Sequence, residues 1–187
     1  MRILWAARWE HDKNPEDFFE ALKILKSRDV AFRINVIGEQ FREAPEAFER
    51  ARQYFTEHID RWGYQKRRAE YEEALTQADV FVSTAQHEFF GITAVEAILA
   101  GAYPILPKRL AYPEILRLGD DERVEEFFYD GSPTDLAGKL AALAERVRDG
   151  RLWTEHTRRA AQPVKRFTWD NTVDTLDAAL DKVCFNH

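Results

Sequence analysis

The sequence predicts an α/β fold, in which an open, Rossmann-like parallel sheet carries helices on both faces. Short apolar or alternating runs typical of strands recur along the chain, and amphipathic helical patterns separate them. Strands that are separated by helices pair in parallel through right-handed crossovers. The length of 187 residues allows one ordinary domain, so we expect residues 1–187 to form a single domain.

The N-terminal part predicts a strand–helix–strand unit. The apolar run Ile3–Ala7 leads into a charged turn, as a buried strand does where it meets a loop. A helix should follow, because Asn14 can cap it, Pro15 suits its first position and an apolar stripe continues behind them. Apolar and polar residues then alternate over Phe32–Val36, and Gly38 favours a turn after this second strand.

The middle of the chain repeats the alternation. A helix over 44–56 precedes a weak strand at Ile59–Trp62, and a further helix contains Tyr71. The β-branched and aromatic run Val80–Thr84 predicts a strand, and the segment Thr93–Ala100 predicts a helix.

The C-terminal part adds one strand and two helices. Tyr103–Leu106 is a further apolar run, and a long helix should begin at Ser132 and end at Gly150. A terminal helix is expected over residues 169–184, since an apolar residue recurs there at helical spacing.

Composition and charge exclude several classes of protein. The 27 Lys and Arg against 33 Asp and Glu leave a net charge of −6, which disfavours a generally basic nucleic-acid-binding surface. No apolar run reaches membrane-spanning length, and early charges such as Arg8 rule out the apolar core of a signal peptide. The single cysteine, Cys184, cannot form a disulfide within the chain. It also cannot form a metal site of several thiolates, and we expect a cytoplasmic protein.

Two cations follow the first predicted strand. Ligands of such sheets bind outside the carboxyl ends of the strands, where Arg8 and Lys13 are placed to neutralise a diphosphate. The competing interpretation is that both are ordinary solvated surface cations.

The segment His87–Ala97 carries the most informative spacing. Glu88 and Glu96 stand eight positions apart, with Gly91 and a helix start near Ile92 between them. Free amides at that helix start can bind an anion, and Gly91 lets a phosphate approach closely. Glu96 could accept hydrogen bonds from two ribose hydroxyls. Alternatively, both acids are solvated, although the apolar neighbours of Glu96 make an unpartnered carboxylate costly there.

Over nearly its whole length the chain resembles the donor-binding, C-terminal half of retaining GT-B glycosyltransferases, within glycosyl transferases group 1 (glycosyltransferase family 4-like). Arg8 and Lys13 match the family's cations after the first strand, although Ala7 replaces the preceding glycine. Glu88 and Glu96, with seven residues between them, match its paired glutamates.

The resemblance implies a role for each matching residue. Arg8, Lys13 and Glu88 would act in catalysis, the two cations on the diphosphate and Glu88 on the hexose. The remaining residues would bind the donor: the amides around Gly91, Ile92 and Thr93 its phosphates, and Glu96 its ribose. Tyr64, with Gly63, would form the turn that lines the base, and Gly38 corresponds to the family's glycine after the second strand.

A narrower resemblance, to tRNA-queuosine mannosyltransferases, rests on three segments. These are RWEHDKNP at Arg8–Pro15, HEFFG at His87–Gly91 and YPEIL at Tyr112–Leu116. It implies transfer of mannose from GDP-mannose to queuosine in tRNA, with retention at the anomeric carbon and with no cofactor or metal beside the nucleotide-sugar substrate.

Family members have two halves, and 187 residues supply one. We therefore expect an N-terminal acceptor domain to be missing, together with its tRNA contacts and the surface against which helix 169–184 packs. The chain alone should bind donor with little turnover. Two alternatives stay open: a UDP-sugar-dependent transferase of the same superfamily, and a non-catalytic nucleotide-binding or interaction domain.

Overall fold

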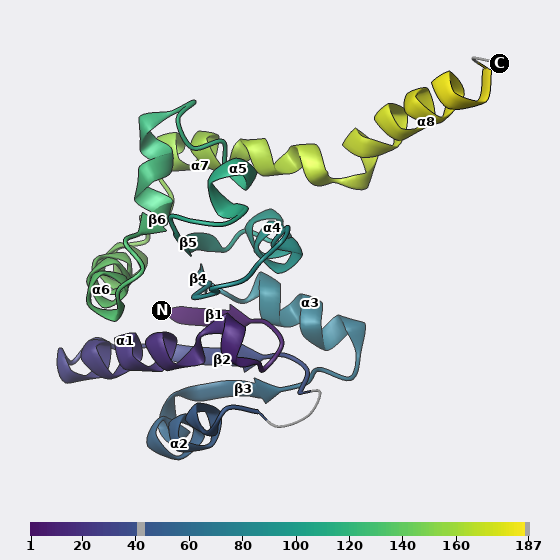
Figure 1. Cartoon of the computed structure of the whole chain (residues 1–187). Helices are drawn as coiled ribbons and strands as arrows, with labels where there is room; N and C mark the ends of the chain where they lie inside the picture. The colour runs from purple at the N-terminus through teal and green to yellow at the C-terminus, as the bar shows by residue number, and fades with distance from the viewer. Residues whose placement is uncertain (41–43, 186–187) are drawn as a thin grey trace.

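The computed structural model describes residues 1–40 and 44–185. Within these residues, six strands form one parallel sheet in the order β3-β2-β1-β4-β5-β6 (Figure 1). The strands are β1 (Arg2–Ala6), β2 (Arg33–Ile37), β3 (Ile59–Gly63), β4 (Val80–Val82), β5 (Tyr103–Pro107) and β6 (Phe128–Tyr129).

Helices connect successive strands. The α-helices are α1 (Pro15–Ser27), α2 (Glu46–Tyr54), α3 (Arg68–Thr76), α4 (Ile92–Leu99), α5 (Tyr112–Ile115), α6 (Pro133–Arg148), α7 (Glu155–Ala161) and α8 (Trp169–Phe185). Short 3-10 helices are η1 (His11–Lys13), η2 (Thr56–His58), η3 (Glu122–Phe127) and η4 (Gln162–Phe167). Helix α1 contacts α2 and α6 on one face of the sheet, and α3 contacts α4 on the other (Figure 1). The predicted fold class is therefore confirmed.

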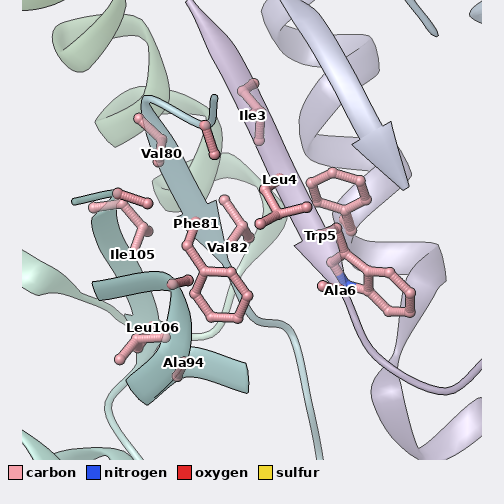
Figure 2. Close-up of a cluster of buried hydrophobic side chains, with 14 of the residues drawn as sticks. Ile3, Leu4, Trp5, Ala6, Val80, Phe81, Val82, Ala94, Ile105 and Leu106 are labelled. Carbon is pink, nitrogen blue, oxygen red and sulfur yellow. The ribbon is translucent and has the colours of Figure 1, made fainter. Parts of the chain in front are cut away.

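The core lies along the central strands. Every residue of the run Ile3–Ala6 is buried, which explains why β1 is apolar throughout instead of alternating. Leu4 pairs with Phe81 and Trp5 with Val82, and side chains of β1, β4 and β5 meet in this core (Figure 2). Trp5 also packs against Phe18 of α1, with their ring centroids 6.1 Å apart.

The predicted helices and strands are present, with boundaries that shift by one or two residues in most of them. Strand β4 ends at Val82, two residues before the predicted end, and the hydroxyl of Thr84 donates to the carbonyl of Lys13 in the loop after β1. Asn14 takes the position before α1, but it adopts a left-handed backbone and its amide contacts Asp17 (2.5 Å) instead of capping the backbone. The short elements β6, α5 and α7 were not predicted, because two, four and seven residues give little room for a repeating pattern.

Helix α8 extends away from the sheet (Figure 1). Trp169, Leu176 and Leu180 are 70%, 45% and 52% exposed. Packing of this helix on an acceptor domain stays a prediction. The side chains of Val183 and Cys184 lie outside the described part of the chain. No helix among the described residues combines the length and the apolar character needed to cross a bilayer.

Candidate functional site

Two adjoining cavities lie at the carboxyl edge of the sheet, where β1, β2 and β4 end. The first has a volume of about 240 Å³ and the second about 510 Å³. They share a wall that consists of Ala6, Ala7 and Arg8 from the end of β1, and of Ile92 and Thr93 from the start of α4. This edge is where open α/β sheets bind their ligands.

The structure brings all the predicted site residues to these two cavities. The first is lined by Lys13, Glu88 and Gly91, the second by Gly38, Tyr64 and Glu96, and both by Arg8, Ile92 and Thr93. Their assigned roles stay predictions, but their proximity follows from the fold.

The loops after β1 and β4 are tied together by hydrogen bonds. The amide of Gln86 donates to the carbonyl of Asp12 (2.8 Å), and the hydroxyl of Thr84 donates to the carbonyl of Lys13 (2.8 Å). The indole nitrogen of Trp5 donates in turn to the Thr84 hydroxyl (3.1 Å). Because Thr84 is fully buried, this contact fixes the position of Lys13 beside the loop that carries Glu88.

Lys13 is a buried cation at the first cavity, with an exposed fraction of 7%. Its Nζ donates to the carbonyl of His87 (2.5 Å) and lies 3.5 Å from Oε2 of Glu88 and 3.3 Å from Oδ2 of Asp12. A buried ammonium group is tolerated because acceptors surround it. Its positive charge is thus held in place at the cavity, where a phosphate would meet it in a partly desolvated setting.

Arg8 differs from Lys13 in its exposure. Its side chain is 53% exposed and pairs with Glu10 at the surface (3.2 Å). Since Arg8 lines both cavities, it is placed to reach a charged group that lies across their shared wall.

Glu88 is held by the loop that leads into α4. Its Oε1 accepts hydrogen bonds from the amides of Gly91 (3.1 Å) and Phe90 (3.4 Å). Gly91 has a φ of +82°, and a Cβ atom there would lie 3.0 Å from Cε1 of Tyr112, so both its conformation and its surroundings favour glycine. The amides of the first turn of α4 have no intrahelical acceptors and attract anions.

Glu96 lies one turn inside α4 and faces the second cavity. The hydroxyl of Tyr71 donates to its Oε2 (2.5 Å), and Nη2 of Arg68 lies 3.3 Å from its Oε1. These partners explain how a carboxylate is accommodated among apolar neighbours. Burial, and then the hydrogen bond to Glu96, raise the pKa of Tyr71 well above its usual value.

Sequence reasoning missed several residues that line these cavities. Tyr71 was assigned only to a helix, and Arg68 was not singled out, although it ends a cationic triplet, Lys66–Arg68, that follows a strand. That triplet was the available signal. Tyr112, which lines the first cavity, hydrogen-bonds the hydroxyl of Ser83 (2.7 Å), and neither had a chemical signature in the sequence. Burial raises the pKa of Tyr112.

The arrangement is chemically suited to an anion flanked by hydroxyl groups. Arg8 and the start of α4 form part of the shared wall, and Lys13 lies in the first cavity. Glu88 lines the first cavity, and Glu39 and Glu96 line the second. Within the described residues, no group of three or more His, Cys, Asp or Glu side chains is arranged to hold a metal ion.

A curated protein is similar to this chain in sequence, and several solved structures are similar to it in fold. The chain is 41% identical over 115 residues to the tRNA-queuosine alpha-mannosyltransferase of Drosophila melanogaster, a match that covers 62% of this chain and 30% of that protein. A glycosyltransferase from Rickettsia africae superposes with a TM-score of 0.76 at 16% identity, over all of this chain and 48% of that one. Anabaena HepE, solved with UDP, gives 0.73 at 16% identity, over 97% and 48%.

The structural neighbours are GT-B glycosyltransferases. Because their sequences are only 16% identical to this chain, the likeness shows a shared fold and nothing more. The sequence model of the family named glycosyl transferases group 1 matches residues 2–159, which is most of the chain. The chain therefore belongs to the glycosyl transferases group 1 family.

Proposed function

We propose that this chain is the donor-binding part of a retaining glycosyltransferase that moves mannose from GDP-mannose to queuosine in tRNA. One observation carries the nucleotide-sugar assignment: the two cavities meet at Arg8 and the start of α4, and Glu88 lines the first cavity while Glu96 of α4 lines the second. A nucleoside diphosphate sugar has the same order of groups, with hydroxyls on the sugar and on the ribose and a diphosphate between them.

The cations and the helix start would act on the diphosphate. Negative charge develops on the leaving diphosphate as the sugar bond breaks, and Arg8 and Lys13 lie where they can stabilise it. A preorganised donor of this kind contributes about 3 kcal/mol to the stabilisation of a transition state. The buried position of Lys13 makes it the better preorganised of the two.

Glu88 would orient the hexose without forming a covalent bond to it. One of its oxygens is already engaged by the amides of Gly91 and Phe90, which suits a binding role. The acceptor hydroxyl would attack from the side of the leaving group, so that retention needs no enzyme nucleophile. Glycosidases, in contrast, place two carboxylates on either side of one bond, whereas Glu88 and Glu96 lie in different cavities.

The proposed acceptor and transferred sugar are based on the name of the relative, whereas GDP is proposed from the resemblance of the sequence segments to mannosyltransferases. The chain spans 30% of the length of the Drosophila protein, whose name specifies mannose and tRNA-queuosine. We infer that a further domain supplies the acceptor site, and that the present chain binds donor without efficient turnover.

Calorimetric titration with GDP, UDP, ADP and GDP-mannose tests this proposal. We expect selective binding of GDP and GDP-mannose, with affinity reduced about tenfold or more in Glu96→Ala and in Arg8→Ala. Glu126→Ala and Arg50→Ala are matched controls, since each removes a paired charge outside the two cavities. Absence of nucleotide binding by the unmodified chain would contradict the proposal.

A UDP-sugar-dependent transferase is the second candidate, because UDP is bound in the structure of Anabaena HepE. Preference for UDP over GDP in the same titration would select it and would keep the roles of Arg8 and Glu96. A non-catalytic nucleotide-binding domain would be favoured by a different result. In that case the chain would bind nucleotide, but no glycosyl transfer would occur even after the remaining part of the Drosophila protein was added.

A further inference from the structure

The two oxygens of Glu96 have different partners. Both partners come from α3, where Arg68 and Tyr71 are three positions apart and so lie on the same side of the helix. The Tyr71 hydroxyl contacts Oε2 and the Arg68 guanidinium contacts Oε1, and both side chains line the second cavity with Glu96.

The two partners differ in how firmly they are held. Tyr71 is half-buried, and its short hydrogen bond to Glu96 (2.5 Å) is made by a rigid ring. Arg68 has a side chain that is 67% exposed, and it shares its charge with Glu72 (2.8 Å) while it lies over the Tyr71 ring at 5.2 Å. An exposed ion pair of this kind contributes little to stability and is easily exchanged.

We propose that Tyr71 is a positioning residue that holds one oxygen of Glu96, so that the other oxygen faces the ribose of a bound nucleotide, and that Arg68 occupies this second oxygen until the ribose displaces it. This inference rests on the proposed function, since it assumes that a nucleotide occupies the second cavity. It adds a residue that orients the carboxylate and a cation that competes with the ligand.

The physical reason is preorganisation. A glutamate side chain that must be ordered on binding loses conformational entropy, and this loss reduces the affinity for the ligand. A carboxylate already held by Tyr71 avoids much of that loss. Arg68 compensates the charge of Glu96 while the cavity is empty, and it retains Glu72 as a partner after it is displaced.

A second group of the same composition serves as a control. The hydroxyl of Tyr103 donates to Glu126 (3.2 Å), and Arg146 lies over the Tyr103 ring at 5.1 Å. These three residues do not line either cavity. Tyr103→Phe therefore removes the same kind of hydrogen bond without touching the proposed nucleotide site.

The experiment compares two ligands, GDP and 2′,3′-dideoxy-GDP, or the corresponding uridine pair if UDP binds more tightly. The ratio of their dissociation constants, the ribose ratio, isolates the contribution of the ribose hydroxyls from that of the phosphates. We expect a ribose ratio of about 10 or more for the unmodified chain and about 2 for Tyr71→Phe, with Tyr103→Phe unchanged. Arg68→Ala, at an exposed position that does not threaten folding, should raise the ratio about threefold.

Several outcomes of this experiment would contradict the inference. A folded Tyr71→Phe variant that keeps the full ribose ratio would overturn the positioning role, and so would a ratio near 1 in the unmodified chain. A lower ratio in Arg68→Ala would show that Arg68 itself binds the ribose, which also contradicts the inference. If the unmodified chain binds no nucleotide, the proposed function fails first, and the inference fails with it.

Discussion

Two Arg–Tyr–Glu groups in this molecule have similar local contacts and different surroundings. Arg68, Tyr71 and Glu96, the cavity triad, line the second cavity. Arg146, Tyr103 and Glu126, the remote triad, join α6, β5 and η3. In both, a guanidinium lies about 5 Å from a tyrosine ring, at 5.2 Å and 5.1 Å, and the tyrosine hydroxyl donates to a glutamate.

The difference lies in what else each triad contacts. In the remote triad, Tyr103 is 1% exposed and packs against Phe127 and Trp153, and Arg146 donates to the carbonyl of Leu152 (2.6 Å). In the cavity triad, Arg68 is exposed and Glu96 faces open space. The same side chains thus join elements of the core at one location and present a carboxylate at the other.

The largest expected effect is on stability, and it should separate the two tyrosines. We expect Tyr103→Ala to lower the free energy of unfolding by about 3–5 kcal/mol, because a fully buried aromatic ring leaves a cavity in the core. Tyr71→Ala should cost about 1–2 kcal/mol, since that ring is half-buried at the edge of a cavity. Urea unfolding followed by circular dichroism measures both, and equal losses would break the comparison.

The next effect is on nucleotide binding. Glu96→Gln keeps the shape of the side chain but removes its charge, and we expect it to weaken binding of the nucleoside diphosphate by about 10- to 100-fold. Glu126→Gln is the matched variant in the remote triad, and calorimetry should give it the affinity of the unmodified chain. A similar loss of affinity in both variants would mean that nucleotide binding depends on the net charge of the protein and not on the position of Glu96.

The glycine that precedes α4 affects the cavity triad, because the start of this helix sets the position of Glu96. We therefore compare it with a second glycine of similar backbone conformation. Gly91 and Gly63 have nearly the same φ, +82° and +86°, but only at Gly91 would a Cβ atom meet other side chains, those of Tyr112 and Ile115. We expect Gly91→Ala to destabilise the fold by about 2–3 kcal/mol and Gly63→Ala by about 1 kcal/mol. Urea unfolding measures both losses of stability, and their difference reflects the contacts of the added Cβ atom at position 91 with Tyr112 and Ile115. Equal losses for the two variants would contradict this prediction.

The smallest effect concerns the two arginines. Arg68→Ala should shift the thermal midpoint by less than about 2 °C, because an exposed ion pair contributes little to the folded state. Arg146→Ala should lower it by about 4 °C, since it loses a hydrogen bond to Leu152 and contact with a buried ring. Differential scanning fluorimetry resolves this difference, and a larger shift for Arg68→Ala would show that its ion pair supports the fold.

Much of the fold could be predicted because its signals are local. The continuous apolar run in β1 and the stripe of α1 at helical spacing can both be recognised in the sequence without knowledge of distant contacts. The short elements β6 and α5 have two and four residues, about one period each, so no pattern repeats within them. Their detection therefore needed the tertiary contacts.

The candidate site divides in the same way. Glu88, Gly91 and Glu96 are close in the chain, so a helix start between two acids could be inferred from their spacing. The partners of these acids could not be inferred. Tyr71 was assigned to a helix without any functional role, because a tyrosine at helical spacing is typical of a packed face.

The sequence by itself determined the alternation of strands and helices, the edge of the sheet at which the candidate site lies, and the two acids around α4. Only the tertiary structure decided that Lys13 is buried beside Glu88, 75 residues away, and that Tyr71 and Arg68 meet Glu96 from α3. The physical reason is that local periodicity follows from backbone geometry, whereas contacts between distant side chains depend on how loops join and how helices pack on the sheet.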